Sequence, residues 1–294
     1  IIGKRFSEKE NQEEWMIASE SLVLENNDYQ IVRDVEPGEA IFINNNGEFY
    51  SQQCSNNPQL YPCSFEYVYL ARPDSVINGI SVYQARLKMG DLLAETIKSE
   101  IRLGDIDVVM PIPDSSRPAA MQVAKQLGIE YREGFFKNRY IGRTFIMPGQ
   151  SLRKKSVRQK LNAMSTEFKG KNVLIVDDSI VRGTTSKQIV QMAKSAGANK
   201  VIFTSAAPPI RYAHVYGINM PSRKELIAYN RTNSEIATQL SIDHLVYQNV
   251  QNLEKAIIEN SQVNNLEMSC FTGDYVTGNI TSEYLDWVEK EYLS

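Results

Sequence analysis

The chain has 294 residues and a formal net charge of −3, with 42% hydrophobic and 23% charged residues, which is ordinary for a globular protein of one large or two modest domains. The small negative charge argues against a general nucleic-acid binder, and no apolar run reaches the roughly 18 residues that a membrane-spanning helix requires. The three cysteines are odd in number and none has C-x-x-C spacing. This pattern indicates a reducing compartment, so we expect a cytoplasmic protein.

Residues 1–60 are predicted to be rich in β-structure. The stretch WMIASES alternates apolar and polar residues over a short run, and EAIFINNNGEFY places Asn46-Gly47 between two strand-like segments. Such a piece is too short and exposed to form a convincing domain by itself. We therefore divide the chain into a β-rich segment, 1–60, and a larger domain, 61–294.

The larger domain is predicted to alternate helices with strands. Apolar residues recur at helical spacing in ARLKMGDLLAETIKSE, after the turn PDSSRP as far as Gly128, and in EKAIIENS. Buried parallel strands are typically short apolar runs. Five segments show this pattern: residues 106–112, 173–176, 200–207, 225–229 and 244–248. The alternation predicts an α/β fold with a mostly parallel sheet flanked by helices.

Two adjacent carboxylates, Asp177 and Asp178, follow the apolar run at 173–176. Because adjacent carboxylates repel each other, they need hydroxyl groups or a cation beside them. The residues from Arg182 to Ser186 offer a glycine that tolerates positive φ and hydroxyls that cap a helix, a combination suited to phosphate. The acids suit vicinal hydroxyls or a divalent cation, so both halves fit one phosphorylated sugar. A solvated strand end with an ordinary helix cap is the alternative.

Residues 137–162 form a long polar segment between two predicted strands. From residue 137 to residue 160 it contains eight Lys or Arg and no acid, interleaved with aromatic residues. Connections longer than about 12–15 residues are usually functional lids or disordered segments. A lid over a polyanionic small molecule and a basic loop that contacts RNA both fit this composition.

Together, these segments resemble the glutamine phosphoribosylpyrophosphate amidotransferases. VLIVDDSIVRGTTS resembles the loop that binds phosphoribosylpyrophosphate (PRPP) in type I phosphoribosyltransferases, and KNRYIGRTFIMPGQ resembles the lid of the family. The likeness continues through FEYVYLARPDS, VVMPIPDSS, SAAPPIRYAHVYGINMPS and CFTGDYVTG. WMIASES and RDVEPGEAI resemble the closing strands of its glutaminase domain. The resemblance implies a type I phosphoribosyltransferase fold with a flexible lid, preceded by a remnant of a glutaminase domain.

The implied activity is that of a glycosyltransferase that moves ammonia, derived from glutamine in the full enzyme, to C1 of PRPP. Pyrophosphate leaves and 5-phosphoribosylamine forms, in the first committed step of purine synthesis. The resemblance also implies Mg²⁺, feedback inhibition by AMP or GMP, and a homotetramer. The glutaminase nucleophile of the family is a cysteine that opens the mature chain, and the first residue here is Ile1. We therefore expect no glutamine-dependent activity from this polypeptide.

The same resemblance assigns roles to individual residues, which fall into four groups. Catalysis is assigned to Asp177, Asp178, Lys137, Arg139, Tyr140 and Arg143; PRPP binding to Asp114, Ser115, Ser116, Arg117, Asp177, Asp178, Ser179, Arg182, Gly183, Thr184, Thr185 and Ser186; the ammonia path to Tyr140 and Ile146; and Mg²⁺ binding to Ser115, Asp177 and Asp178.

An iron–sulfur cluster is not expected. Some members of the family hold a 4Fe–4S cluster on four cysteines, and two of those positions are Cys63 and Cys270 here. The other two are Val215 and Glu267. Valine cannot ligate iron and a lone glutamate is a poor substitute for a thiolate, so a four-cysteine cluster cannot assemble.

Three other functions are left open by the sequence. One is a regulator of phosphoribosyltransferase fold that senses PRPP or purine nucleotides without turnover. Another is a base-using phosphoribosyltransferase that shares only the PRPP loop, and the third is RNA binding by residues 137–160. A nucleotide hydrolase with a Walker-type acidic strand is excluded because the chain contains no G-x-x-x-x-G-K-S/T motif.

Overall fold

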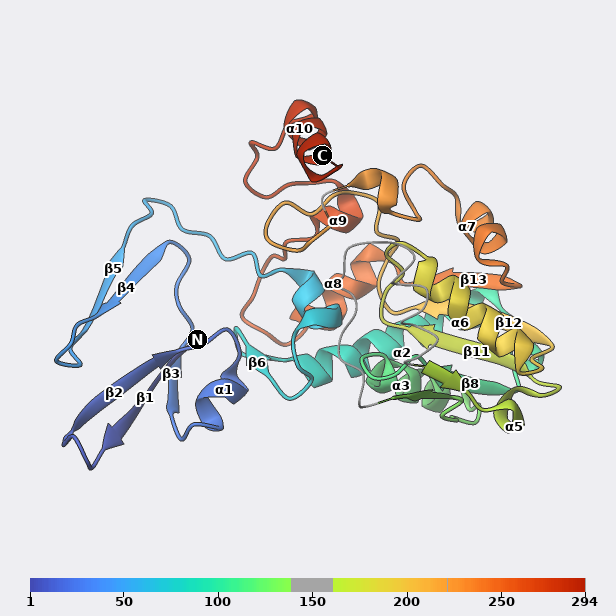
Figure 1. Ribbon diagram of the computed structural model, residues 1–294, viewed down its shortest axis with the longest axis horizontal. Coiled ribbons are helices and arrows are strands. Elements are labelled where there is room, and N and C mark those ends of the chain that lie inside the picture. Colours follow the sequence, from blue (N-terminus) through green and yellow to red (C-terminus); the bar gives the residue numbers. More distant parts are fainter. Residues whose placement is uncertain (139–160, 221, 294) are drawn as a thin grey trace. The chain divides into compact units, whose positions relative to one another are not determined.

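The computed structural model describes residues 1–138, 161–220 and 222–293, and Figure 1 shows their course. Contacts divide the chain into two compact units, which are described separately. Unit 1 comprises Ile1–Ala85 and Ile257–Glu267, and unit 2 comprises Arg86–Ala256 and Met268–Ser294. The expected division near residue 60 rests on the change in sequence pattern there, and it stays a prediction. No helix in the described ranges is long and apolar enough to cross a membrane.

Unit 1 is built from small antiparallel sheets. Strand β1 (Ile2–Ser7) pairs with β2 (Gln12–Ile17) and with β3 (Gln30–Arg33). A hairpin of β4 (Glu39–Ile43) and β5 (Phe49–Gln53) turns at Asn46-Gly47 as predicted. The remaining elements are helix α1 (Ser21–Glu25), the π-helical turn η1 (Glu66–Leu70) and the strand pair β6 (Val76–Ile77) and β7 (Ile80–Ser81). The strands confirm the predicted β-structure of residues 1–60.

The centre of unit 2 is a four-stranded parallel sheet with the strand order β13-β12-β11-β8. Its strands are β8 (Val108–Pro111), β11 (Asn172–Asp177), β12 (Lys200–Ser205) and β13 (His244–Tyr247). They lie side by side in Figure 1, and nearly all of their residues are buried, as expected for strands covered on both faces. The predicted α/β fold with a parallel sheet is confirmed.

Helices cover both faces of this sheet. Ile189, Val190 and Ala193 of one helix share a core with alternate strand residues such as Val173 and Ile175. The intervening strand residues are buried on the opposite face, where another helix packs against β8. Among the described residues, two helices lie mostly in unit 2 and have a few residues in unit 1: α2 (Val82–Glu100) and α8 (Val250–Ile258). The other helices of unit 2 are α3 (Arg117–Leu127), α5 (Ser165–Phe168), α6 (Thr184–Ser195), α7 (Asn233–Leu240), α9 (Ser269–Thr272) and α10 (Ser282–Leu293), with the short turns η2 (Leu103–Asp105) and η3 (Arg223–Glu225).

A small antiparallel ribbon stands beside the main sheet. It consists of β9 (Phe135–Lys137) and β10 (Leu161–Ala163), and Leu161 lies opposite Lys137. The ribbon brings together the two described ends that border residues 139–160. Phe135 packs edge-on against Phe168 with a distance of 5.0 Å between ring centroids, which joins the ribbon to the core of unit 2.

The prediction of a strand at residues 225–229 is wrong. Residues 227–230 form a turn after η3. Arg211 Nη1 donates hydrogen bonds to the carbonyl oxygens of Ala228 and Arg231, each at 2.8 Å, so these backbone groups bond a side chain and not a neighbouring strand. Leu226, Ile227 and Ala228 of this run are nonetheless buried. A short apolar run therefore does not distinguish a buried strand from a buried turn.

Candidate functional site

Two turns meet where β8 and β11 end. Strand β8 leads into the turn Pro113–Ser116, and β11 leads into residues 178–183. The backbone N–H of Ile112 donates to the carbonyl oxygen of Val176 at 2.9 Å, which keeps the two strand ends together. Ligands of open α/β sheets bind at the carboxyl ends of the strands, so this edge is the expected position of a site.

The two predicted acids lie side by side at this edge. Asp177 and Asp178 are 7% and 8% exposed. The hydroxyls of Ser115 and Ser179 donate to the two carboxylate oxygens of Asp178, the Ser179 bond measuring 2.6 Å. The backbone N–H of Asp178 donates to Asp177 Oδ1 at 3.0 Å. The fold thus brings together Ser115, Asp177 and Asp178, the three residues that the resemblance assigns to Mg²⁺ binding.

Burial raises the pKa of both carboxyl groups above their ordinary values. For Asp177 the negative charge of Asp178 raises the pKa further. For Asp178 the hydrogen bonds from Ser115 and Ser179 and the positive charge of Arg86 oppose the rise in pKa without cancelling it. Arg86, which is 3% exposed, was not identified from the sequence. The pair is a buried concentration of negative charge that favours a cation or hydroxyl donors as its ligand.

The turn after Asp177 and Asp178 leads directly into the first residue of α6. Gly183 has φ of +73° and precedes Thr184, the first residue of the helix. The first N–H groups of a helix have no partner within it and are suited to an anion. Arg182 instead points to Glu225, whose Oε2 accepts from Nε at 2.9 Å and from Nη2 at 2.8 Å. Glu225, which the sequence did not single out, therefore holds the arginine of this loop. Ser186 is buried, whereas Thr185 is exposed.

Replacing Gly183 with alanine is expected to lower the free energy of unfolding by about 1–3 kcal/mol, because of positive φ and a steric overlap. A Cβ atom here would lie 2.2 Å from Cδ1 of Ile227. Gly128 is a matched control, since its φ is +67° and a Cβ would meet nothing within 4 Å. Gly128→Ala should therefore cost only the backbone term, about 1 kcal/mol. Urea unfolding measures both variants; equal costs would mean that Ile227 moves aside freely.

The turn after β8 has an unusual backbone. The peptide bond between Pro113 and Asp114 is cis. Ser116 is 1% exposed, and its hydroxyl donates to the carbonyl oxygen of Ile112 at 2.5 Å. The side chain of Ser116, which the sequence assigned to PRPP binding, therefore supports the turn from inside.

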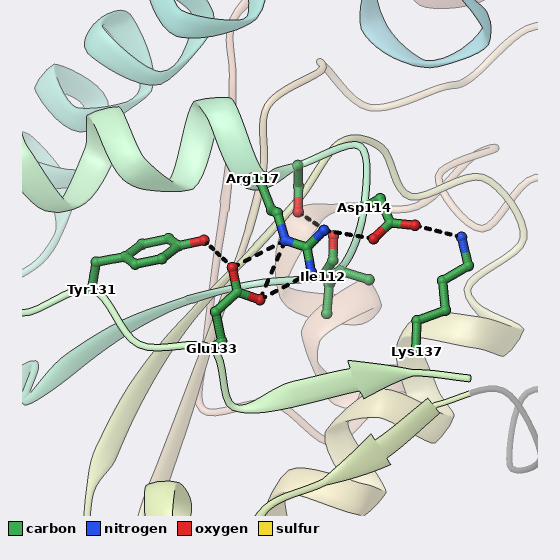
Figure 2. A network of polar contacts seen from close by, with 7 residues as sticks. Ile112, Asp114, Arg117, Tyr131, Glu133 and Lys137 are labelled. Atoms are coloured by element: carbon green, nitrogen blue, oxygen red, sulfur yellow. Dashed lines mark hydrogen bonds and ion pairs between the residues drawn. The ribbon is translucent and has the colours of Figure 1, made fainter. Parts of the chain in front are cut away.

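A polar network surrounds the exposed side of the same turn (Figure 2). Asp114 accepts from Arg117 Nη1 at 2.6 Å and from Lys137 Nζ at 2.7 Å. Partial burial alone would raise the pKa of Asp114, but these two cations lower it overall. Arg117 also contacts Glu133, which accepts from Tyr131. The structure thus joins the predicted residues Asp114, Arg117 and Lys137 and adds two residues that the sequence did not indicate.

Arg139, Tyr140, Arg143 and Ile146, assigned to the lid and the ammonia path, are outside the described residues. In unit 1, burial and then the charge of Glu267 raise the pKa of Cys63 to about 12, which keeps this group as a neutral thiol. In unit 2, Cys270 is buried within α9.

Known proteins share both the sequence and the fold of this chain. Residues 81–221 match the family described as the phosphoribosyl transferase domain. The amidophosphoribosyltransferase of Pseudomonas aeruginosa is 54% identical over 291 residues, which cover 99% of this chain and 58% of that protein. The glutamine PRPP amidotransferase from B. subtilis, solved in complex with ADP and GMP, aligns with a TM-score of 0.79 and 38% identity over 97% of this chain and 61% of that one.

A second solved structure, described as the allosteric regulatory enzyme of purine biosynthesis, aligns with a TM-score of 0.81 and 39% identity. The alignment covers 98% of this chain and 60% of that one. At these identities the likeness extends through both units. The chain spans somewhat more than half the length of the relatives that it matches, 58% in the case of the Pseudomonas aeruginosa protein.

Proposed function

The chain belongs to the amidophosphoribosyltransferase family, and from this premise we propose that it transfers ammonia to C1 of PRPP with release of pyrophosphate. The product would be 5-phosphoribosylamine, in the first committed step of de novo purine synthesis. The observation that carries the proposal is the buried pair Asp177 and Asp178 between two anion-suited turns. PRPP has a ribose diol between a phosphate and a pyrophosphate, so its groups match this arrangement.

The acids are proposed to act electrostatically. In the reaction the bond from C1 to the pyrophosphate oxygen breaks and its electron pair leaves on that oxygen, while the lone pair of ammonia forms a bond to C1. One proton passes from the nitrogen to the departing pyrophosphate. Positive charge develops at C1 and the ring oxygen. Asp177 and Asp178, placed at the ribose 2- and 3-hydroxyls, would favour that charge without transferring a proton.

The two turns are proposed to bind the two ends of PRPP. The 5-phosphate would accept hydrogen bonds from the backbone N–H groups and hydroxyls of residues 182–186 at the start of α6. The pyrophosphate would face residues 114–117 after β8. Ser179, whose hydroxyl bonds Asp178, would hold that carboxylate in place for the sugar.

A divalent metal fits the donors present. Ser115, Asp177 and Asp178 offer oxygen ligands only, and the buried carboxylates carry negative charge that lacks full compensation. This is the chemistry of a Mg²⁺ site that also uses substrate phosphates. The bound ion would neutralise charge on the departing pyrophosphate.

The lid segment is proposed to close over bound PRPP. Lys137 lies at its border in β9, beside Asp114. Arg139 and Arg143 would add positive charge, and Tyr140 and Ile146 would help to wall the path of ammonia. Exclusion of water matters because water would otherwise attack C1 in place of ammonia.

Regulation and assembly are further parts of the proposal. The B. subtilis relative was solved with ADP and GMP. Because a purine nucleotide shares the 5-phosphoribosyl group of PRPP, AMP or GMP would compete for the turn at α6. The chain is proposed to form a homotetramer, which light scattering of the purified protein would test. Residues 1–60 are proposed to be the end of a glutaminase domain.

Release of pyrophosphate tests the function directly. The purified chain should release pyrophosphate from PRPP only when ammonium and Mg²⁺ are both present, and a metal chelator should stop the release. No release under these conditions would favour the alternative, a sensor of PRPP or purine nucleotides. Turnover with adenine or guanine in place of ammonium would indicate a base-using phosphoribosyltransferase.

A further inference from the structure

Arg117 is held by a carboxylate to which the proposed mechanism gives no role. The guanidinium donates from Nε to Glu133 Oε1 at 3.0 Å and from Nη2 to Glu133 Oε2 at 3.2 Å, a two-pronged contact visible in Figure 2. The hydroxyl of Tyr131 donates to the same Oε1 at 2.7 Å. Two-pronged pairs of this kind fix the plane of a guanidinium as well as its position.

The backbone that carries Tyr131 and Glu133 is fixed to the edge of the sheet. Val109 N–H donates to the carbonyl of Glu130 at 2.9 Å, and Arg132 N–H donates to the carbonyl of Val109 at 3.0 Å. At Gly134 a Cβ would lie 2.3 Å from Sδ of Met110, so the chain approaches β8 closely. Glu133 therefore has a defined place relative to the end of β8 and the turn that follows it.

The contact with Glu133 decides which edge of Arg117 faces the turn. A guanidinium has five N–H donors, and Glu133 occupies the edge formed by Nε and Nη2. The Nη1 edge is directed to Asp114, at 2.6 Å, and Lys137 approaches the other oxygen of Asp114, at 2.7 Å. The side chain of Asp114 is 55% exposed. Ion pairs this exposed are weak and exchange easily.

Pyrophosphate offers these two cations more negative charge and more acceptor oxygens than one carboxylate does. Exchange from Asp114 to pyrophosphate would leave Arg117 still paired with Glu133, so the guanidinium would not need to reorient. An arginine that is already oriented loses less conformational freedom when its ligand binds.

We propose that Glu133, supported by Tyr131, is a positioning residue that presents the Nη1 edge of Arg117 to the pyrophosphate of PRPP. Arg117 and Lys137 exchange Asp114 for pyrophosphate oxygens when the substrate binds. This inference rests on the proposed function, in which residues 114–117 face the pyrophosphate.

The test compares Glu133→Gln with the unchanged protein in pyrophosphate release at saturating ammonium and Mg²⁺. Glutamine keeps the size of the side chain but loses the charge and one acceptor oxygen. The KM for PRPP should rise about 5- to 20-fold, and kcat should change less than about twofold. The Kd of inorganic pyrophosphate with Mg²⁺, measured by calorimetry, should rise by a similar factor. Tyr131→Phe should shift both constants in the same direction by about two- to threefold.

Two comparisons separate positioning from a general structural effect. Glu130→Gln is the matched control, since Glu130 lies on the same segment and pairs with Arg132 at 2.8 Å, not with Arg117. The KM of this variant for PRPP should equal that of the unchanged protein. In an Arg117→Ala background, Glu133→Gln should raise the KM for PRPP less than about twofold, because its effect passes through Arg117.

Equal effects of Glu133→Gln with and without Arg117 would overturn the inference, and so would an unchanged KM in an active protein. Failure of the unchanged protein to release pyrophosphate would contradict the proposed function instead. Thermal unfolding of each variant by circular dichroism checks the fold, and the midpoint should move by less than about 2 °C because the pair is partly exposed.

Discussion

Replacing Asp178 with asparagine is expected to lower kcat for pyrophosphate release by about 100- to 1,000-fold while the protein stays folded. The carboxylate is proposed to bind the ribose and Mg²⁺, and an amide lacks the charge that both interactions use. The hydrogen bonds around it survive the change, since the introduced amide would keep one acceptor oxygen and the hydroxyls of Ser115 and Ser179 can rotate to accept from its NH₂ group. Steady-state release of pyrophosphate and thermal unfolding measure the two effects.

Asp107→Asn is the matched control for this variant. Asp107 precedes β8 at the opposite end of the sheet, where its Oδ2 accepts from the backbone N–H of Asn172, the first residue of β11, at 2.7 Å. Its replacement should change stability slightly and leave kcat unaltered. Parallel losses of stability and turnover in Asp178→Asn would assign the carboxylate a structural role.

Replacing Asp177 with asparagine is expected to stabilise the ligand-free protein at pH 7 and to abolish turnover. Asp177 lies beside another buried carboxylate, and burial together with the charge of Asp178 raises its pKa. Replacing Asp177 removes the free-energy cost of burying its charge and the repulsion between the two carboxylates. The Oδ1 atom of the introduced asparagine can still accept a hydrogen bond from the backbone N–H of Asp178. We expect the unfolding midpoint to rise by about 3–6 °C. Differential scanning calorimetry without Mg²⁺ measures this rise.

The pH dependence of that gain has a defined sign. Because the folded pKa of Asp177 lies above the unfolded value of about 3.9, the stability linked to its proton is fully present below pH 3.9 and is lost as the pH rises through the folded pKa. Asparagine does not titrate, so the variant does not lose stability at this position as the pH rises. The difference in unfolding free energy between Asp177→Asn and the unchanged protein should therefore be near zero at pH 3.5 and largest near neutral pH. A constant difference across this range would contradict the explanation.

Adding Mg²⁺ and pyrophosphate should reduce the stability advantage of Asp177→Asn over the unchanged protein. A ligand that binds only the folded state stabilises it by mass action. The unchanged protein should gain stability from Mg²⁺ with pyrophosphate, and Asp177→Asn should gain little. A functional carboxylate pair is expected to destabilise the ligand-free protein and to be stabilised when its ligand binds.

The prediction from sequence succeeded for regular elements and failed for an irregular one. The apolar runs at 106–112, 173–176, 200–207 and 244–248 each coincide with a strand of the sheet to within two residues at either end, because buried parallel strands have a local signature. The run at 225–229 has the same composition but folds as a buried turn, in which the backbone carbonyl of Ala228 accepts a hydrogen bond from the side chain of Arg211. No property of residues 225–229 alone reports the position of that arginine.

Partners that lie far apart in the sequence were also beyond prediction. Glu225 holds Arg182, Glu133 holds Arg117, and Arg86 acts on Asp178, yet each is one charged residue among many. A charge pattern is informative when residues are three or four positions apart on one helix. It says nothing about two turns that a sheet brings together.

The amino-acid sequence by itself determined that Asp177 and Asp178 follow a buried strand, that a glycine and three hydroxyl residues open the next helix, and that a basic segment precedes them. These are local properties, set by hydrophobic pattern and turn chemistry. Only the tertiary structure decided that β8 lies beside β11, so that Ser115 reaches Asp178. Burial at that edge, which raises the pKa of both acids, follows from strand order and packing, because the dielectric surroundings of a carboxylate depend on what folds around it.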